Sequence, residues 1–253
     1  MNDIKPEHPR AESLQTRKKL ADGFKKGLVT PEGLSAHGRG EAFDYILGEK
    51  TTKQAKKAIR AGAAELLLAE KPVFSVNGNV AALVPEEISE LSKKTNIEIE
   101  VNLFHRSKER EEKIASHLKD HGLDKVLGTE EKHSSEISEI ESNRRIVDER
   151  GIKAADTVFV PLEDGDRTKN LVSLGKKVIT IDLNPMSRTA KSADITITNN
   201  IVRAMPLFIK ELEKLKESSQ EKLSKITKNF DNEQNLRKML KLMLKRLENL
   251  SHR

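Results

Sequence analysis

The chain has 253 residues, which is enough for one large α/β domain or two small ones. Its residues are 36% hydrophobic and 34% charged, and no apolar run is long enough to cross a bilayer, so we expect a soluble protein. The absence of cysteine excludes disulfides, thiolate zinc sites and cysteine nucleophiles. The polar N-terminus has no apolar segment of the secretory type, so we expect a cytoplasmic protein.

The formal net charge of +6 raises the question of nucleic-acid binding. Aromatic residues make up only 3% of the chain, so side chains that could stack on bases are scarce. The basic residues are also interspersed with acidic ones instead of forming blocks. The composition therefore favours a small anionic ligand such as ATP and leaves nucleic acid as the less favoured alternative.

The first fifty residues are predicted to be mainly helical. Residues 10–25 have apolar positions at helical spacing, and the Thr-Pro-Glu of residues 30–32 is typical of a helix start. The Gly-Arg-Gly of residues 38–40 places Arg39 between two permissive backbone positions, which suits close approach to a ligand. A simple turn explains Arg39 about equally well at this stage.

Helical and β segments alternate between residues 51 and 216. Helices are predicted over 51–70, 80–83, 85–96, 107–121, 134–150, 164–171 and 201–215, and strands over 73–76, 97–103, 126–127, 158–160, 178–181 and 195–197. This alternation indicates the α/β class, with a Rossmann-like, doubly wound and mostly parallel sheet. We therefore expect an N-terminal helical segment (1–50), a Rossmann-like core (51–216) and a C-terminal helical pair (217–253), all in one structural domain.

The C-terminal extension is predicted to be two helices, over residues 218–230 and 232–250. The second helix carries an apolar stripe at helical spacing, which needs a partner surface: Leu236, Met239, Leu240, Met243, Leu244 and Leu247. Its own sheet and a second subunit are both possible partners.

Polar clusters follow three consecutive β segments. They are Glu-Asp-Gly-Asp-Arg-Thr at 163–168, Asp-Leu-Asn-Pro at 182–185 followed by Ser-Arg-Thr at 187–189, and Thr-Asn-Asn at 198–200. Because ligands bind beyond the carboxyl ends of parallel strands, these clusters predict one binding rim. Residues 164–171 also follow a strand and open a helix, so their amides suit an anion. One such cluster is ordinary turn chemistry, but three in succession favour a site.

A further Asn-Gly-Asn, at residues 77–79, lies between a predicted strand and a predicted helix. Small residues in this position expose backbone amides to an anion such as phosphate. Asn-Gly is also the commonest hairpin turn, but the helical residues that follow disfavour a hairpin. His117 and His121 lie one helical turn apart; a solvated helix face explains them better than a metal site, and the metal ligands remain unassigned.

Five sequence blocks occur in an order that resembles the archaeal phosphopantothenate synthetase family, also called 4-phosphopantoate–β-alanine ligases. The blocks are GRGEAFDYILGE (38–49), SVNGNVAALVPEE (75–87), PLEDGDRT (161–168), DLNPMSRTA (182–190) and NNIVRAMP (199–206). The resemblance spans nearly the whole chain. It implies a homodimer with a Rossmann-like core that joins 4-phosphopantoate to β-alanine in coenzyme A synthesis, converting ATP to AMP and pyrophosphate.

By matching position, the resemblance implies ATP contacts at nine residues: Arg17, Arg39, Asp182, Leu183, Asn184, Arg188, Thr189, Asn200 and Ile201. Arg17 is the exception among them, since its sequence pattern alone indicates a solvated helix face. Release of AMP implies an acyl-adenylate intermediate. We expect Mg²⁺ to accompany the nucleotide, held mainly by phosphates and water.

The remaining site predictions are hypotheses about chemistry. Asp164 or Asp166 is a candidate to hold Mg²⁺ or to steer the ammonium of β-alanine. Asn77, Gly78 and Asn79 are candidates to hold the 4-phosphate or the acyl oxyanion. Gly78, Asn79 and Arg167 are predicted to bind the acid substrate. Structural turns explain Asp164 and Asn77 nearly as well. Three other classes remain open: a nucleotide-binding regulator without turnover, a nucleic-acid-binding protein, and a kinase-type enzyme that releases ADP.

Overall fold

A five-stranded parallel sheet lies at the centre of the protein. The computed structural model describes residue 8 and residues 10–252. The strands are β1 (Pro72–Val76), β2 (Glu98–Val101), β5 (Thr157–Phe159), β6 (Lys177–Ile181) and β7 (Ile195–Ile197), in the order β2-β1-β5-β6-β7. Numbered within this sheet alone, the order is 2-1-3-4-5, which is that of flavodoxin-like doubly wound domains. The predicted α/β fold with a Rossmann-like, parallel sheet is therefore confirmed.

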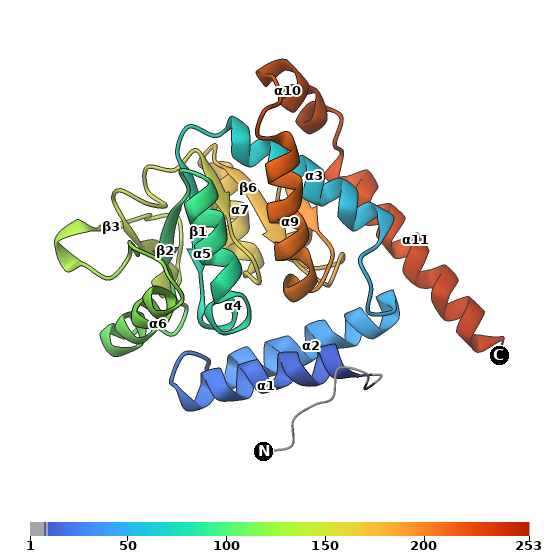
Figure 1. Ribbon diagram of the computed structural model, residues 1–253, viewed down its shortest axis with the longest axis horizontal. Coiled ribbons are helices and arrows are strands. Elements are labelled where there is room, and N and C mark those ends of the chain that lie inside the picture. Colours follow the sequence, from blue (N-terminus) through green and yellow to red (C-terminus); the bar gives the residue numbers. More distant parts are fainter. Residues whose placement is uncertain (1–7, 9, 253) are drawn as a thin grey trace.

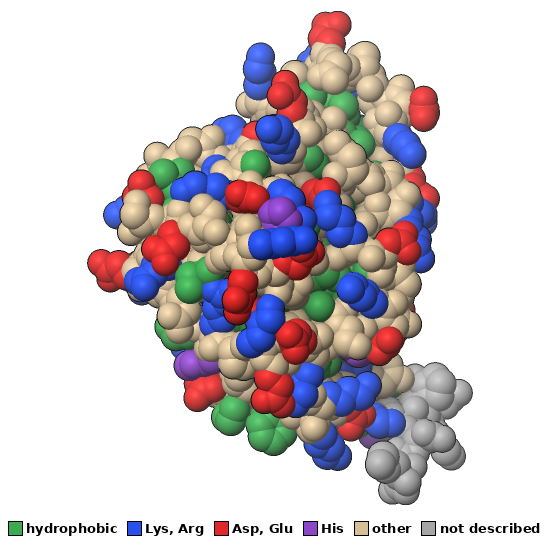
Figure 2. Space-filling view, turned by 90° about the vertical axis from the view of Figure 1, so that its left-hand side faces the viewer, with side chains coloured by type: hydrophobic (Ala, Val, Ile, Leu, Met, Phe, Trp, Pro, Cys, Tyr) green, Lys and Arg blue, Asp and Glu red, His purple; other side chains and the backbone are tan. Residues whose placement is uncertain are grey.

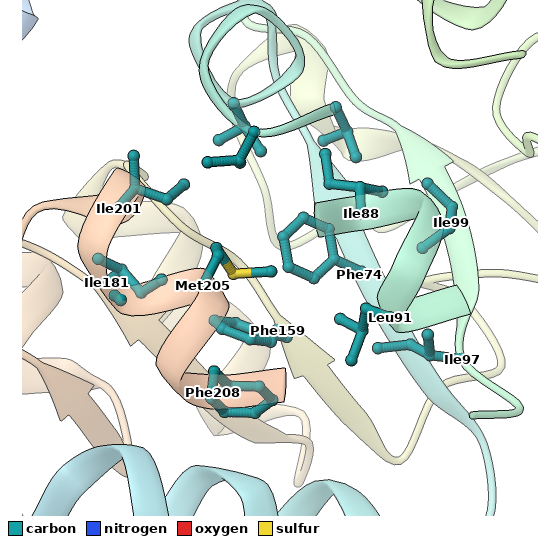
Figure 3. Packing of buried hydrophobic residues seen from close by; sticks show 14 of the residues in the cluster. Phe74, Ile88, Leu91, Ile97, Ile99, Phe159, Ile181, Ile201, Met205 and Phe208 are labelled. Carbon is teal, nitrogen blue, oxygen red and sulfur yellow. The ribbon is translucent and has the colours of Figure 1, made fainter. Parts of the chain in front are cut away.

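Helices cover both faces of the sheet. The larger core lies against α3 (Lys53–Leu68), α4 (Gly78–Leu83), α5 (Pro85–Lys94), α6 (Lys108–Asp120) and α9 (Ile201–Leu215), and the smaller one against α7 (Gly165–Ser173) and the end of α8 (Arg188–Ser192). Because successive strand residues point to opposite faces, Phe74 and Phe159 enter the larger core whereas Val73 and Val158 enter the smaller one. Figure 3 shows Phe74 and Phe159 packed beside Met205 of α9.

The Ala-rich helix α3 packs closely against both the sheet and α9. A Cβ atom at Gly62 would lie 3.1 Å from the Phe208 ring and 3.2 Å from Ile179, so glycine permits this close approach. The same helix contacts α10 (Gln220–Lys228) and α11 (Asn232–Ser251), as Figure 1 shows on the side of the molecule that carries α9. Helices from the beginning and the end of the core therefore meet on one face of the sheet.

The first half of α11 packs on its own molecule. Leu236, Met239 and Met243 of its apolar stripe are buried, and the helix contacts α2, α3 and β7. The outer part differs, because Leu244 is 61% exposed and Leu247 is 46% exposed. In Figure 1 this part extends away from the sheet towards the C-terminus. Packing against its own molecule therefore explains the first part of the apolar stripe, but it does not explain Leu244 and Leu247.

Two N-terminal helices lie beyond the carboxyl ends of the strands. They are α1 (Ala11–Lys25) and α2 (Pro31–Leu47), which run side by side next to α4 (Figure 1). Helix α2 begins at the predicted Thr-Pro-Glu signal, where the Thr30 hydroxyl accepts a hydrogen bond from the Gly33 amide. It ends at Gly48, whose φ of 84° lies in the left-handed region that glycine adopts readily.

The helix predicted over residues 134–150 is wrong. The segment instead forms a short antiparallel pair, β3 (Ser134–Glu136) with β4 (Ile146–Asp148), flanked by the 3₁₀ turns η1 (Glu131–His133) and η2 (Asn143–Arg145). The segment's sequence favours a helix, but hydrogen bonds with two buried side chains, Glu100 in β2 and Asn102 just after it, hold its main chain in this extended form. Asn102 donates to the Ile146 carbonyl, and Glu100 accepts from the Asp148 amide. The short strand predicted over 126–127 is a single parallel bridge between Leu127 and Glu100.

Among residues 8 and 10–252, none of the helices combines the length and the hydropathy that a transmembrane span requires. On the face shown in Figure 2, the basic and acidic side chains are interspersed, and neither sign gathers into a large patch.

Candidate functional site

A cavity of about 810 Å³ runs along the carboxyl edge of the sheet. Segments that follow all five strands line it: 103–105 after β2, 77–79 after β1, 162–165 after β5, 182–189 after β6, and 200–201 after β7. Residues of α2 complete the lining. The topological switch point, between β1 and β5, lies in the middle of this edge. Doubly wound sheets bind their ligands at this position.

Most of the residues predicted from the sequence to form the site line this cavity: Arg39, Asn77, Gly78, Asn79, Asp164, Asp182, Leu183, Asn184, Arg188, Thr189, Asn200 and Ile201. Arg17, Asp166 and Arg167 lie outside the lining. Arg17 is held on the α1–α2 surface by Glu41 and by the Tyr45 hydroxyl, 2.9 Å away. Contacts of these three residues with a ligand stay predictions.

Asp166 and Arg167 occupy opposite environments although they are neighbours in the chain. Asp166 is exposed and forms an ion pair of 3.0 Å with Arg188. Arg167 is completely buried beneath the cavity, where it pairs with Glu163 and donates to the Ser75 hydroxyl. The exposed pair joins the segments after β5 and β6, whereas the buried arginine supports a carboxylate under the cavity.

Asp182 organises the segment that follows β6. Its carboxylate accepts hydrogen bonds from the Asn184 amide, at 2.9 Å, and from the Ser187 hydroxyl. Ser187 in turn caps α8 by accepting from the Ala190 amide. Burial raises the pKa of Asp182, although the hydrogen bonds and the charge of Arg39 oppose the rise. A partly desolvated carboxylate therefore holds the turn that presents Arg188 at the cavity.

Gly165 allows the segments after β5 and β6 to touch. A Cβ atom at this position would lie 2.3 Å from the Arg188 Cβ and 3.0 Å from the Thr189 amide nitrogen. The Thr189 hydroxyl also donates to the Glu163 carbonyl, at 2.8 Å. Asp164 caps the helix that Gly165 begins by accepting from the Arg167 amide. The first turns of α7 and α8 are consequently fixed against each other at the cavity wall.

Glu163 forms a buried ion cluster with two arginines. Its side chain is 0% exposed and pairs with both Arg144 and Arg167. Burial raises the pKa of Glu163, while the two guanidinium groups oppose the rise. Because Arg144 lines the cavity and Arg167 is fully buried, the cluster connects the cavity wall to the protein interior.

Asp44 joins α2 to the start of α9. Its buried carboxylate accepts from the Asn200 side-chain amide at 3.0 Å and pairs with Arg203. Asn200 caps α9 by accepting from the Val202 amide. The helix that covers the cavity is thus held to the segment that follows β7.

Sequence reasoning missed several lining residues, above all Arg110 on α6 and Arg144 in η2. The local sequence around each of these arginines predicts a charged, solvent-exposed helix. The sequence signal nearby is His105, which lies two residues after the predicted strand over 97–103 and also lines the cavity. No group of three or more His, Asp or Glu side chains converges on a metal position within the part of the chain that the structure describes.

Residues 54–246 match the family described as phosphopantothenate/pantothenate synthetase. The chain is 49% identical to the 4-phosphopantoate–β-alanine ligase of Thermococcus kodakarensis over 252 residues, which are 99% of this chain and 96% of that protein. It is 48% identical to the ligase of Thermococcus onnurineus with the same coverage. It is 50% identical to that of Methanosarcina mazei over 236 residues, 93% and 92% of the two chains. The chain therefore belongs to the phosphopantothenate/pantothenate synthetase family, as its sequence blocks predict.

Proposed function

We propose that this chain is an ATP-dependent ligase that joins 4-phosphopantoate to β-alanine and releases AMP and pyrophosphate, a step of coenzyme A biosynthesis. The observation that carries the proposal is the convergence of strand-end segments on one cavity at the switch point of the sheet. Relatives about half identical over nearly the full chain bear the name of this ligase activity, which supports the same assignment.

We place the nucleotide at the β6 and β7 end of the cavity. Asp182 is positioned there to accept a ribose hydroxyl, as acids at strand ends of dinucleotide-binding sheets do. Arg39 and Arg188 supply positive charge for the phosphates, because a guanidinium can grip phosphate with two parallel hydrogen bonds. Asn200 and Ile201 follow β7 and complete this end of the lining.

The chemistry follows from the leaving groups. A carboxylate cannot expel oxide at neutral pH, so a carboxylate oxygen of the acid attacks the α-phosphorus and the bond to the β-phosphate breaks, which releases pyrophosphate. The amine of β-alanine, after losing its proton, then attacks the acyl carbon, and the bond to AMP breaks. The residues of the cavity contribute by holding the reacting groups close together and by neutralising phosphate charge.

Asp164 is the residue we assign to a divalent cation. Its Oδ2 atom is buried and has no hydrogen-bond partner among the described residues, although Arg144 Nε lies 3.8 Å away. Burial alone would raise its pKa, but the Arg167 amide and the nearby guanidinium groups lower it, so the group is ionised and can coordinate. Mg²⁺ bound with a nucleotide needs few protein ligands, and it would neutralise phosphate charge there.

The direct test is an assay with Mg-ATP, 4-phosphopantoate and β-alanine in which each component is omitted in turn. We expect AMP and pyrophosphate to form only when both acid and amine are present, and pyrophosphate exchange into ATP with the acid alone. Release of ADP would instead indicate that the acid is activated as an acyl phosphate. ATP binding without any turnover would contradict the ligase assignment and indicate a nucleotide-binding regulator.

The raised pKa of Asp182 predicts that nucleotide binding weakens at acidic pH, which would appear as an acidic limb in the pH profile of the KM for ATP. The ionised carboxylate accepts from Ser187 and Asn184, and protonation weakens these hydrogen bonds. Since the pKa lies above that of an ordinary aspartate, about 3.9, the KM for ATP should rise as the pH falls through this raised value. Asp182→Asn should raise the KM at every pH and abolish the limb. A variant that retains the acidic limb would assign it to another group.

We also propose that the enzyme is a cytoplasmic homodimer. The outer part of α11 exposes Leu244, Leu247 and Leu250, and this exposed apolar row fits a second copy of the chain. Light scattering of the purified protein tests the assembly, and a monomer at micromolar concentration would contradict it.

A further inference from the structure

We propose that Arg110 and Arg144 form a phosphate subsite at the β2 end of the cavity, where they bind the 4-phosphate of the acid substrate and select phosphorylated over unphosphorylated acid. The inference rests on the proposed ligase function. Both arginines line the cavity, together with His105 from the segment that follows β2.

The guanidinium of Arg110 is held in place by main-chain carbonyls. Its Nε and Nη2 atoms donate to the Leu28 carbonyl at 3.1 and 2.8 Å, and its Nη1 atom donates to the His105 carbonyl at 2.8 Å. Within residues 8 and 10–252, no carboxylate forms an ion pair with it. Each Nη atom keeps a second hydrogen free. Arg110 is therefore an oriented cation without an ion pair to the described carboxylates, and the nearby charge of Glu32 only partly compensates it.

Arg110 also lies directly beside the start of α4. A Cβ atom on Gly78 would be 2.0 Å from the Leu28 carbonyl oxygen and 2.6 Å from Nη2 of Arg110. Only a residue without a side chain leaves room for the carbonyl and the guanidinium together. The Asn-Gly-Asn segment predicted to bind the acid substrate and this missed arginine thus share one corner of the cavity.

Arg144 supplies a second cation to the same end. It is nine-tenths buried, one of its Nη atoms pairs with Glu163, and its Nε atom lies 3.8 Å from Asp164 Oδ2, an ion pair too long to be a hydrogen bond. Burial and the charge of Arg144 both lower the pKa of Arg110, so the two guanidinium groups repel each other. A dianionic phosphate between them would relieve this repulsion and use their remaining donors.

The position separates this subsite from the nucleotide end. Neighbouring strands are about 4.8 Å apart, so β2 and β6, three strands apart in the sheet, are separated by on the order of 14 Å. A phosphate at β2 therefore belongs to a different group from the nucleotide phosphates near Arg188. The acid would extend from Arg110 towards the switch point, which directs its carboxylate to the nucleotide.

The experiment compares Arg110→Met with the control Lys113→Met, which removes an exposed cation from the same helix. We expect Arg110→Met to raise the KM for 4-phosphopantoate by about 10- to 100-fold, the loss of one or two charge-assisted hydrogen bonds. The KM for ATP, and activity with unphosphorylated pantoate, should stay within about twofold. Arg110→Lys should recover only part of the loss, because a lysine cannot make the forked contact.

Calorimetry with 4-phosphopantoate alone measures the subsite without turnover. The wild type and Lys113→Met should bind it and Arg110→Met should not, with thermal unfolding confirming that all three are folded. A rise in the KM for ATP instead, equal losses for phosphorylated and unphosphorylated acid, or undiminished binding by Arg110→Met would overturn the assignment. Absence of AMP formation by the wild type, with phosphopantoate binding still dependent on Arg110, would instead refute the ligase function and keep the subsite.

Discussion

Glu163→Ala should lower the free energy of unfolding by about 3–5 kcal/mol, because it leaves two buried guanidinium groups without their carboxylate. The side chain is fully buried and pairs with both Arg144 and Arg167. Arg167 would remain buried without its ion-pair partner, and Arg144 would keep only the longer contact of 3.8 Å with Asp164. Urea unfolding followed by circular dichroism measures the change.

Glu141→Ala is the matched control for this effect. Glu141 is an exposed glutamate in the segment next to Arg144, so its removal should change the free energy of unfolding by no more than about 0.5 kcal/mol. Glu163→Gln should lower the free energy of unfolding by an amount between those of Glu163→Ala and Glu141→Ala, because the amide keeps the shape of the side chain but loses its charge. Equal stability of Glu163→Ala and the wild type would show that the arginines find other partners.

Gly165→Ala should reduce kcat/KM for ATP by about 100-fold, the scale of loss that a displacement of about 1 Å produces in an active site. The added methyl group would lie 2.3 Å from the Arg188 Cβ, and the nearby main chain of residue 189 leaves no flexible atom to yield. The first turn of α8 must therefore shift, together with Arg188 and Thr189, which we propose contact the nucleotide. Steady-state kinetics with varied ATP gives the measurement.

Gly38→Ala tests the same substitution where space is available. A Cβ at Gly38, in the middle of α2, would meet no atom within 4 Å. Alanine favours the helix over glycine by about 1 kcal/mol, so this variant should be as active as the wild type and slightly more stable. Unchanged ATP kinetics in Gly165→Ala would mean that the α7–α8 contact does not position the nucleotide site.

Several site residues are predictable because each cluster follows its own strand directly in the chain. Asp182 comes immediately after a short run of β-branched residues and Asn200 two residues after another, and parallel strands must bring their carboxyl ends to one edge. Periodicity and strand-end chemistry therefore give both the sheet and the position of these two residues. The pattern is local, so it is visible in a sequence.

Arg110 and Arg144 could not be found in this way. Arg110 owes its orientation to the carbonyl of Leu28, which is 82 residues away in the chain. Arg144 lies in a segment whose charged composition favours a helix, and contacts with distant residues, among them the buried Glu100 and Asn102, hold that segment in another shape. Both positions depend on tertiary contacts, which local patterns do not contain.

The pairing of β1 with β5 has a consequence for how the chain folds during synthesis. The central strand β1 is complete at Val76, but its neighbour β5 begins only at Thr157, and the helix that covers α3 begins at Ile201. Contacts between residues so distant in the chain form slowly, because the entropy of closing a long loop must be overcome first. The apolar side of α3 must therefore wait, uncovered, until most of the protein has left the ribosome, which makes the nascent chain a natural client for chaperones.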